Sequence, residues 1–258
     1  MNHARRGSGQ PLGLIHGIGS HLQVWRPVTR PLSERYDVIA VDVPGFGQSP
    51  PLPPEVEPTV DAFATAFERF FEELGIPTPH VAGNSMGGGI ALELGRRGSA
   101  RSVTAVAPIG FWTARERRFC QLSLKLRHDV PEPARRAALA LTASGAGRTL
   151  QMNQIFARPW LIPPEAARRT LENFWASPAF TRALAAFDSY TFRNGHEIDV
   201  PVSVLWGSRD RLLLYGRQAP RARRALPDAR HVTLEGLGHT PFYDDPGVVA
   251  RELMAGLP

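Results

Sequence analysis

The sequence predicts an α/β fold, in which helices cover a doubly wound, mostly parallel sheet and a helical lid is inserted between two strands. Continuous apolar stretches at residues 12–15, 38–43 and 202–206 each end at a turn signal, as strands buried on both faces do. Helical patterns alternate with these stretches, which is typical of right-handed strand–helix–strand crossovers. The alternation stops over residues 111–198, where only helical patterns remain.

Weaker segments complete the predicted sheet. Shorter apolar runs at residues 80–83, 102–107 and 231–234 have the same strand character. Only about ten residues precede the strong stretch at 12–15, which leaves room for one short strand around residues 2–6. We therefore expect the first edge of the sheet to be reduced.

The clearest predicted helix covers residues 60–74 and ends at Gly75, with Pro77 just beyond it. Two further helices are predicted at residues 86–97 and 247–255. The apolar residues of the first helix share one face, as expected for a helix that packs on a sheet: Val60, Phe63, Ala64, Phe67, Phe70, Phe71 and Leu74.

Residues of about 111–198 are expected to form helices that are separated by proline and glycine breaks. Because this region lies between two strands of one sheet, it is expected to be a lid and not a separate folding unit. The sequence therefore predicts a single domain over residues 1–258.

The composition limits the classes of partner. The net charge is +6, but the basic residues are dispersed without interleaved aromatic residues, so we expect no nucleic-acid partner. Cys120 is the only cysteine, which excludes an intrachain disulfide and a cysteine-built metal site, and we expect no metal or cofactor. No apolar run approaches the roughly 20 residues that span a membrane. The polar start lacks a secretory signal, so we expect a cytoplasmic location; the oligomeric state is not indicated.

A candidate nucleophile lies in the pentapeptide GNSMG at residues 83–87, with Ser85 at its centre. A predicted strand precedes it and a predicted helix follows it, as a sharp strand–turn–helix connection requires. The glycines allow a strained serine backbone and a close approach of neighbouring chains. The alternative is a plain glycine-rich turn.

A serine hydroxyl needs a neighbouring base, and a carboxylate to orient that base. Among the eight histidines, His239 is the best candidate because it follows the last predicted strand in a glycine-containing loop. Asp210 follows the strong strand at residues 202–206 and is the candidate acid. Asp244 and Asp245 follow His239 too closely, so we expect them to cap the last helix.

The oxyanion that forms on attack needs preorganised N–H donors. Met86 follows the nucleophile and is expected to supply one backbone N–H. The loop after the first strong strand, HGIG at residues 16–19, is expected to supply the other from Ile18, with Gly17 close by. His16 itself is expected to hydrogen-bond the backbone of its loop.

Five segments together, at residues 14–17, 42–49, 83–88, 207–210 and 238–239, resemble the α/β-hydrolase superfamily in order and spacing. The chain is similar to single-domain bacterial members such as carbon–carbon bond hydrolases, small esterases and cofactor-free haloperoxidases. The resemblance covers nearly the whole chain and is weakest in the lid. It implies the roles given above to Ser85, Asp210, His239, Ile18 and Met86, and a structural turn at residues 42–49.

The predicted lid and its flanks are rich in aromatic residues, so we expect an apolar pocket for a small molecule. Gly17, Trp112, Phe156 and Trp160 are the candidate substrate-binding residues. The expected function is hydrolysis of a carboxylic ester, thioester or lactone with a hydrophobic moiety. A carbon–carbon bond hydrolase and a non-catalytic ligand receptor remain alternatives, whereas haloalkane dehalogenases and epoxide hydrolases are excluded because they require an aspartate where this chain has Ser85.

Overall fold

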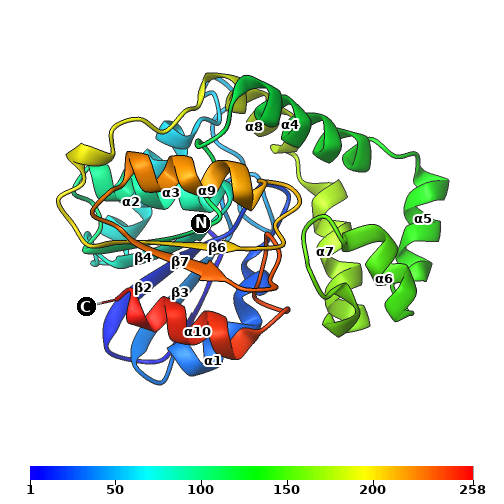
Figure 1. Ribbon diagram of the computed structural model, residues 1–258, viewed down its shortest axis with the longest axis horizontal. Helices are drawn as coiled ribbons and strands as arrows, with labels where there is room; N and C mark the ends of the chain where they lie inside the picture. The colour runs from blue at the N-terminus through cyan, green and yellow to red at the C-terminus, as the bar shows by residue number, and fades with distance from the viewer. Residues whose placement is uncertain (258) are drawn as a thin grey trace.

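Seven strands form one sheet in the computed structural model, which describes residues 1–257 (Figure 1). Their order across the sheet is β1-β3-β2-β4-β5-β6-β7, with β1 antiparallel to β3 and every other neighbouring pair parallel. The prediction of a mostly parallel sheet with one short first strand is confirmed. The strands are β1 His3–Arg6, β2 Gln10–Ile15, β3 Tyr36–Val41, β4 His80–Asn84, β5 Ser102–Val106, β6 Val202–Gly207 and β7 Arg230–Leu234.

Helices cover both faces of the sheet, as a doubly wound fold requires (Figure 1). On one face lie α1 (Arg26–Leu32) and α10 (Pro246–Ala255), and on the other lie α2 (Val60–Glu73), α3 (Met86–Arg96) and α9 (Tyr215–Ala225). The three helices predicted from the sequence are α2, α3 and α10. The sequence did not predict α1, because it is only seven residues long and contains two prolines.

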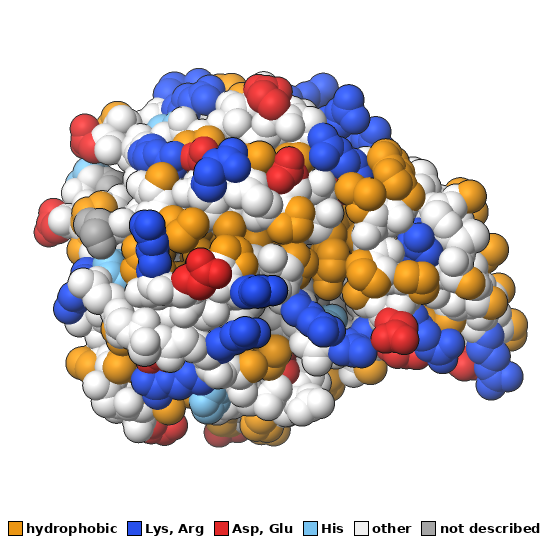
Figure 2. Space-filling view, turned by 90° about the horizontal axis from the view of Figure 1, so that it is seen from below, with side chains coloured by type: hydrophobic (Ala, Val, Ile, Leu, Met, Phe, Trp, Pro, Cys, Tyr) orange, Lys and Arg blue, Asp and Glu red, His pale blue; other side chains and the backbone are white. Residues whose placement is uncertain are grey.

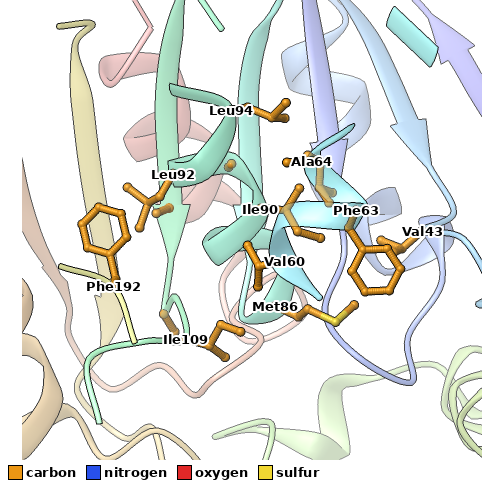
Figure 3. Close-up of a cluster of buried hydrophobic side chains, with 14 of the residues drawn as sticks. Val43, Val60, Phe63, Ala64, Met86, Ile90, Leu92, Leu94, Ile109 and Phe192 are labelled. Carbon is orange, nitrogen blue, oxygen red and sulfur yellow. The ribbon is translucent and has the colours of Figure 1, made fainter. Parts of the chain in front are cut away.

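The core between the sheet and helices α2 and α3 is built from the apolar face of α2. Its Phe63, Phe67 and Phe71 are fully buried, and burying each such side chain stabilises the fold by about 1.5–3 kcal/mol. Figure 3 shows Phe63 with Ile90 and Met86 of α3 in the same cluster. At its start, α2 is fixed by Thr59, whose hydroxyl accepts a hydrogen bond from the Ala62 N–H (3.1 Å).

A helical insertion, residues 107–201, separates β5 from β6. The predicted absence of strands from this region is confirmed for the described chain. Helices α5 to α7 stand to one side of the sheet (Figure 1). The helices of the insertion are α4 Ala114–His128, α5 Glu132–Leu141, α6 Gly145–Met152, α7 Pro164–Ala176 and α8 Phe180–Ala186, with 3-10 turns η2 Pro159–Leu161, η3 Phe187–Ser189 and η4 Gly195–Glu197.

The insertion also exposes large apolar side chains. Within residues 1–257, each large hydrophobic side chain that is strongly exposed belongs to it. Figure 2 shows hydrophobic side chains at the surface on the right, where the insertion lies, with basic side chains beside them. The exposed residues are Phe119, Leu122, Leu126, Leu141, Leu150, Trp160 and Leu161.

Candidate active site

Ser85 lies at the sharp turn between β4 and α3. Its backbone is left-handed (φ 57°, ψ −116°), a conformation that costs a non-glycine residue on the order of 1–3 kcal/mol. Hydrogen bonds hold it there: the Ser85 N–H donates to the Val106 carbonyl (2.9 Å), and the Ser85 carbonyl accepts from the N–H groups of Gly89 and Ile109. A side chain at Gly83 would collide with the Gly87 carbonyl. The pentapeptide is therefore the strained strand–turn–helix connection that the sequence predicts.

The sheet topology brings the Gly17 loop next to Ser85. After β2 the chain moves outward to β3 and then crosses back to β4, so β2 and β4 are neighbours whose connections leave in opposite directions. Such a switch point opens a crevice at the carboxyl ends of the strands. A Cβ atom added to Gly17 would lie 3.0 Å from the Ser85 Cβ, which is tighter than most Cβ contacts in proteins, so this loop passes close to the serine.

His16 fixes the shape of this loop. Its ring is fully buried, and the Val43 N–H donates to Nε2 (3.0 Å). Nδ1 therefore carries the hydrogen and donates to the Gly17 carbonyl (2.8 Å). Burial lowers the pKa of His16, so the ring is neutral at neutral pH. The prediction that His16 hydrogen-bonds the backbone of its loop is confirmed.

His239 and Asp210 are hydrogen-bonded to each other. Nδ1 of His239 lies 2.8 Å from Oδ2 of Asp210, and both side chains are buried. Asp210 also accepts from the backbone N–H groups of Leu212 (2.9 Å) and Leu213 (2.8 Å) and from the Trp206 indole (3.1 Å). These hydrogen bonds to both oxygens fix the orientation of the carboxylate toward the imidazole.

Asn84 connects the serine turn to the histidine loop. In the sequence it is only a polar residue beside the candidate nucleophile, and its role was not predicted. Its side-chain amide donates to the carbonyls of Val106 (3.1 Å) and His239 (3.0 Å). Its Oδ1 accepts from the Thr240 hydroxyl (3.1 Å). This buried amide therefore holds residue 239 in position relative to residue 85.

A cavity of about 300 Å³ lies where these elements meet. Ser85 and His239 line its sheet side, together with Gly17 and Ile18, and Phe156 lines it from the insertion. The insertion contributes further apolar residues to the lining, from the segment that runs from α4 to α7: Leu124, Val130, Ala134, Ala138, Leu150, Met152, Ile155, Leu171, Phe174 and Trp175.

Two of the predicted substrate-binding residues lie elsewhere, and for them the prediction is wrong. Trp112 does not line the cavity; its indole donates to the Tyr190 carbonyl (3.0 Å) and its ring packs on Phe187. Trp160 lies in η2 and is 50% exposed, also outside the cavity. Aromatic content alone does not distinguish a residue of the cavity from one in the insertion's own core or on its surface.

The two residues predicted to donate N–H groups differ in position: Ile18 belongs to the cavity lining, whereas Met86 does not and directly follows Ser85 in the chain. Ile18 lines the cavity, and no backbone carbonyl within residues 1–257 accepts a hydrogen bond from its N–H. Met86 is the first residue of α3, so its N–H has no acceptor within the helix. Its side chain points away into the apolar core (Figure 3).

Asp244 does not cap the last helix, and that part of the prediction is wrong. Its carboxylate accepts from the N–H groups of Gly238 (2.8 Å), Ala157 (3.0 Å) and Arg158 (2.7 Å). It therefore joins the loop before His239 to the insertion. Asp245 does cap α10, by accepting from the Val248 N–H (3.0 Å).

Of the serine of the pentapeptide and the single cysteine, Ser85 lines the cavity and Cys120 does not. Cys120 is buried, and burial raises the pKa of its thiol, so it stays protonated. Within residues 1–257 there is no group of three His, Cys, Asp or Glu side chains placed to hold a metal ion. No helix of the described chain combines the length and the apolar character needed to cross a membrane.

The family of the chain follows from a match to a family model of the alpha/beta hydrolase fold, which covers residues 10–246. The chain belongs to this family. It is 32% identical to an epoxide hydrolase (EphH) of Mycobacterium tuberculosis, over 71% of this chain and 88% of that one. It is 29% identical to a pimeloyl-[acyl-carrier protein] methyl ester esterase of Aeromonas hydrophila, over 94% of this chain and 93% of that one. Among solved structures, a bacterial membrane phospholipase A is similar with a TM-score of 0.77 and 27% identity, over 99% of this chain and 81% of that one.

Proposed function

We propose that this alpha/beta hydrolase is a serine hydrolase that cleaves a carboxylic ester, thioester or lactone with a hydrophobic moiety. The observation that carries the proposal is the hydrogen bond between His239 and Asp210 beside a strained Ser85 on one apolar cavity. A base oriented by a carboxylate and a serine exposed to the same space is what nucleophilic acyl transfer requires.

In the proposed reaction, Ser85 Oγ attacks the carbonyl carbon while His239 Nε2 takes the hydroxyl proton. Asp210 holds the imidazole with Nδ1 protonated and stabilises the imidazolium. The N–H groups of Ile18 and Met86 donate to the oxyanion, each contributing about 10²–10³-fold in rate. His239 then protonates the leaving group, and water, activated by the same imidazole, releases the acyl group from Ser85.

The cavity supports a substrate with an apolar part. Its insertion side is lined by aliphatic and aromatic side chains, which favour a hydrocarbon chain or ring over a polar one. We propose that the insertion acts as a lid that excludes water from the acyl-enzyme. The similarity to an enzyme named as a methyl ester esterase agrees with this substrate class.

The similarity to an enzyme named as an epoxide hydrolase does not favour epoxide opening here. A carboxylate that attacks an epoxide forms an ester, which water can hydrolyse in a second step. The hydroxyl of Ser85 would form an ether instead, and the His239 base cannot make water cleave an ether. Acyl transfer is the reaction in which a serine nucleophile is regenerated.

The test is Ser85→Ala measured with p-nitrophenyl butyrate and with a fluorophosphonate label. We expect turnover to fall by about 10⁴-fold or more and labelling to disappear, because the attacking oxygen is absent. Ser20→Ala is the matched control, since Ser20 also lines the cavity; it should still be labelled and turn over ester. Turnover by Ser85→Ala at the wild-type rate would refute the proposal.

A further inference from the structure

Arg127 is the one residue of the cavity lining, apart from His239, that can carry a charge. The lining contains no aspartate, glutamate or lysine. Within residues 1–257 Arg127 also makes no ion pair, whereas Arg136 and Arg168 of the same insertion pair with glutamates one helical turn away. A cation without a counter-ion beside an apolar cavity can bind an anionic group of a ligand.

Arg127 is an exposed residue, and two hydrogen bonds orient its guanidinium. Its Nε donates to the Gln154 side chain (3.0 Å) and its Nη1 to the Gln151 carbonyl (2.8 Å). Gln151 itself lines the cavity, so these bonds keep the charge at the cavity's edge. The Trp175 indole, from another lining residue, donates to the Arg127 carbonyl (3.0 Å). Nη2 donates to no group within residues 1–257, and the planar fork is preorganised to bind an oxyanion.

Arg127 and the candidate nucleophile enter the cavity from different sides. Ser85 and His239 come from the ends of strands, whereas Arg127 comes from the last turn of α4, in the insertion. Most of the other residues that the insertion contributes to the lining are apolar, including Leu124 and Phe174. A ligand that reaches both would carry its scissile carbonyl at one end and its charge at the other, with a hydrocarbon segment between.

We propose that Arg127 selects esters whose apolar chain ends in an anionic oxygen group, a carboxylate or a phosphate. The inference rests on the proposed function, because it names the substrate class of that same site. The chain of such a substrate occupies the apolar lining, and its terminal anion binds the free edge of the Arg127 guanidinium.

The kinetic test compares p-nitrophenyl monoesters of adipic acid and of a phosphonohexanoic acid with the neutral p-nitrophenyl hexanoate. We expect wild-type kcat/KM to be about tenfold higher for the anionic substrates, as one charge-assisted hydrogen bond allows, and to fall with added salt. A preference for only one of the two anions would identify the terminal group. Equal kcat/KM for the anionic and neutral esters would overturn the inference while leaving the proposed function intact.

Arg127→Met removes the charge but keeps the apolar stem. It should lose the preference for anionic esters and still hydrolyse hexanoate. Arg127→Lys should retain part of the preference. Arg136→Met is the matched control, because this exposed arginine of the insertion lies outside the cavity lining, and it should keep the full preference. An undiminished preference in Arg127→Met would overturn the inference.

A binding measurement separates the inference from the serine chemistry. Monomethyl adipate should bind Ser85→Ala about tenfold more tightly, by titration calorimetry, than it binds Ser85→Ala combined with Arg127→Met. This readout needs no turnover, so it stands even if the wild-type protein hydrolyses no ester. Equal affinities for the two proteins would overturn the assignment of Arg127.

Discussion

On the side of the sheet, most residues that line the cavity are buried, whereas on the side of the insertion most of the apolar lining residues are partly or strongly exposed. Ser85 and His239 are 5% and 3% exposed, and Leu150 is 69% exposed. The ends of strands in one sheet hold the candidate catalytic groups in place. Such rigidity matters because a small displacement of a catalytic group greatly lowers the rate of the reaction. The insertion contributes apolar surface and the charge of Arg127 to the cavity. Substitutions in the insertion can change these features without altering the sheet.

The largest expected effect is on the sheet side, at Asp210. Asp210→Asn keeps the size of the side chain but places an N–H donor where the imidazole needs an acceptor. We expect kcat for p-nitrophenyl butyrate to fall by about 10³–10⁴-fold, because His239 would adopt the wrong tautomer. Asp228→Asn, at an exposed position, should change kcat by less than twofold. A loss below tenfold for Asp210→Asn would point to a different acid.

The strands of the sheet could be predicted from the sequence because each one depends on a short, continuous segment of the chain. Each strand is a short apolar run. Ser85 follows β4 directly, and Asp210 and His239 lie in the loops that follow β6 and β7, so the parallel strands bring these positions to one edge of the sheet. The two glycines of the turn, at 83 and 87, could also be interpreted from the sequence. Neither position has room for a Cβ atom, so the close packing there requires glycine.

The parts that the sequence did not predict depend on contacts between distant segments. Asn84 bonds residues 155 positions further along the chain, and Asp244 bonds residues of the insertion. Asp244 and Asp245 are adjacent carboxylates, and only their surroundings distinguish the cap from the connection to the insertion. Trp112 and Trp160 lie outside the cavity lining for the same reason, because tertiary packing decides which side chains of the insertion meet the cavity.

A second prediction concerns the connection between the two sides, at Asp244. Asp244→Ala leaves the N–H groups of Gly238, Ala157 and Arg158 without their acceptor, and an unsatisfied buried donor costs about 1–3 kcal/mol. We expect the free energy of unfolding, from urea titration, to fall by about 3 kcal/mol or more. Amide hydrogen exchange at residues 155–158 should also become faster.

The control for this prediction is the neighbouring carboxylate. Asp245→Ala removes only the cap of α10 and should cost about 1 kcal/mol, without faster exchange at residues 155–158. Equal losses in the two variants would show that Asp244 does not join the insertion to the His239 loop.

A third prediction uses pH to probe the buried sheet side. Burial lowers the pKa of His21 to about 4, with a further contribution from nearby His16; the unfolded value is about 6.5. Below pH 6.5 the unfolded chain therefore takes up a proton that the folded chain does not, and stability falls as the pH falls toward 4. Between pH 7 and 5 this one histidine should lower the free energy of unfolding by about 2 kcal/mol.

His21→Asn should therefore lose about 2 kcal/mol less than the wild type over this pH range, measured by urea titration at both pH values. The pH dependence will not vanish, because burial lowers the pKa of His16 as well. His196→Asn, at an exposed position, should follow the wild type. An unchanged slope in His21→Asn would mean that His21 does not contribute to the acid sensitivity.

The smallest expected effect is on the insertion side, where Leu150 and Trp160 are both exposed but only Leu150 lines the cavity. Leu150→Ala removes apolar surface that a long acyl chain would cover, at about 25 cal/mol per Å². We expect about a fivefold lower kcat/KM for p-nitrophenyl decanoate, with p-nitrophenyl acetate unaffected. Trp160→Ala should change neither substrate by more than twofold, although its side chain is larger. A chain-length effect at Trp160 and none at Leu150 would mean that the acyl chain leaves the cavity along a different face of the insertion.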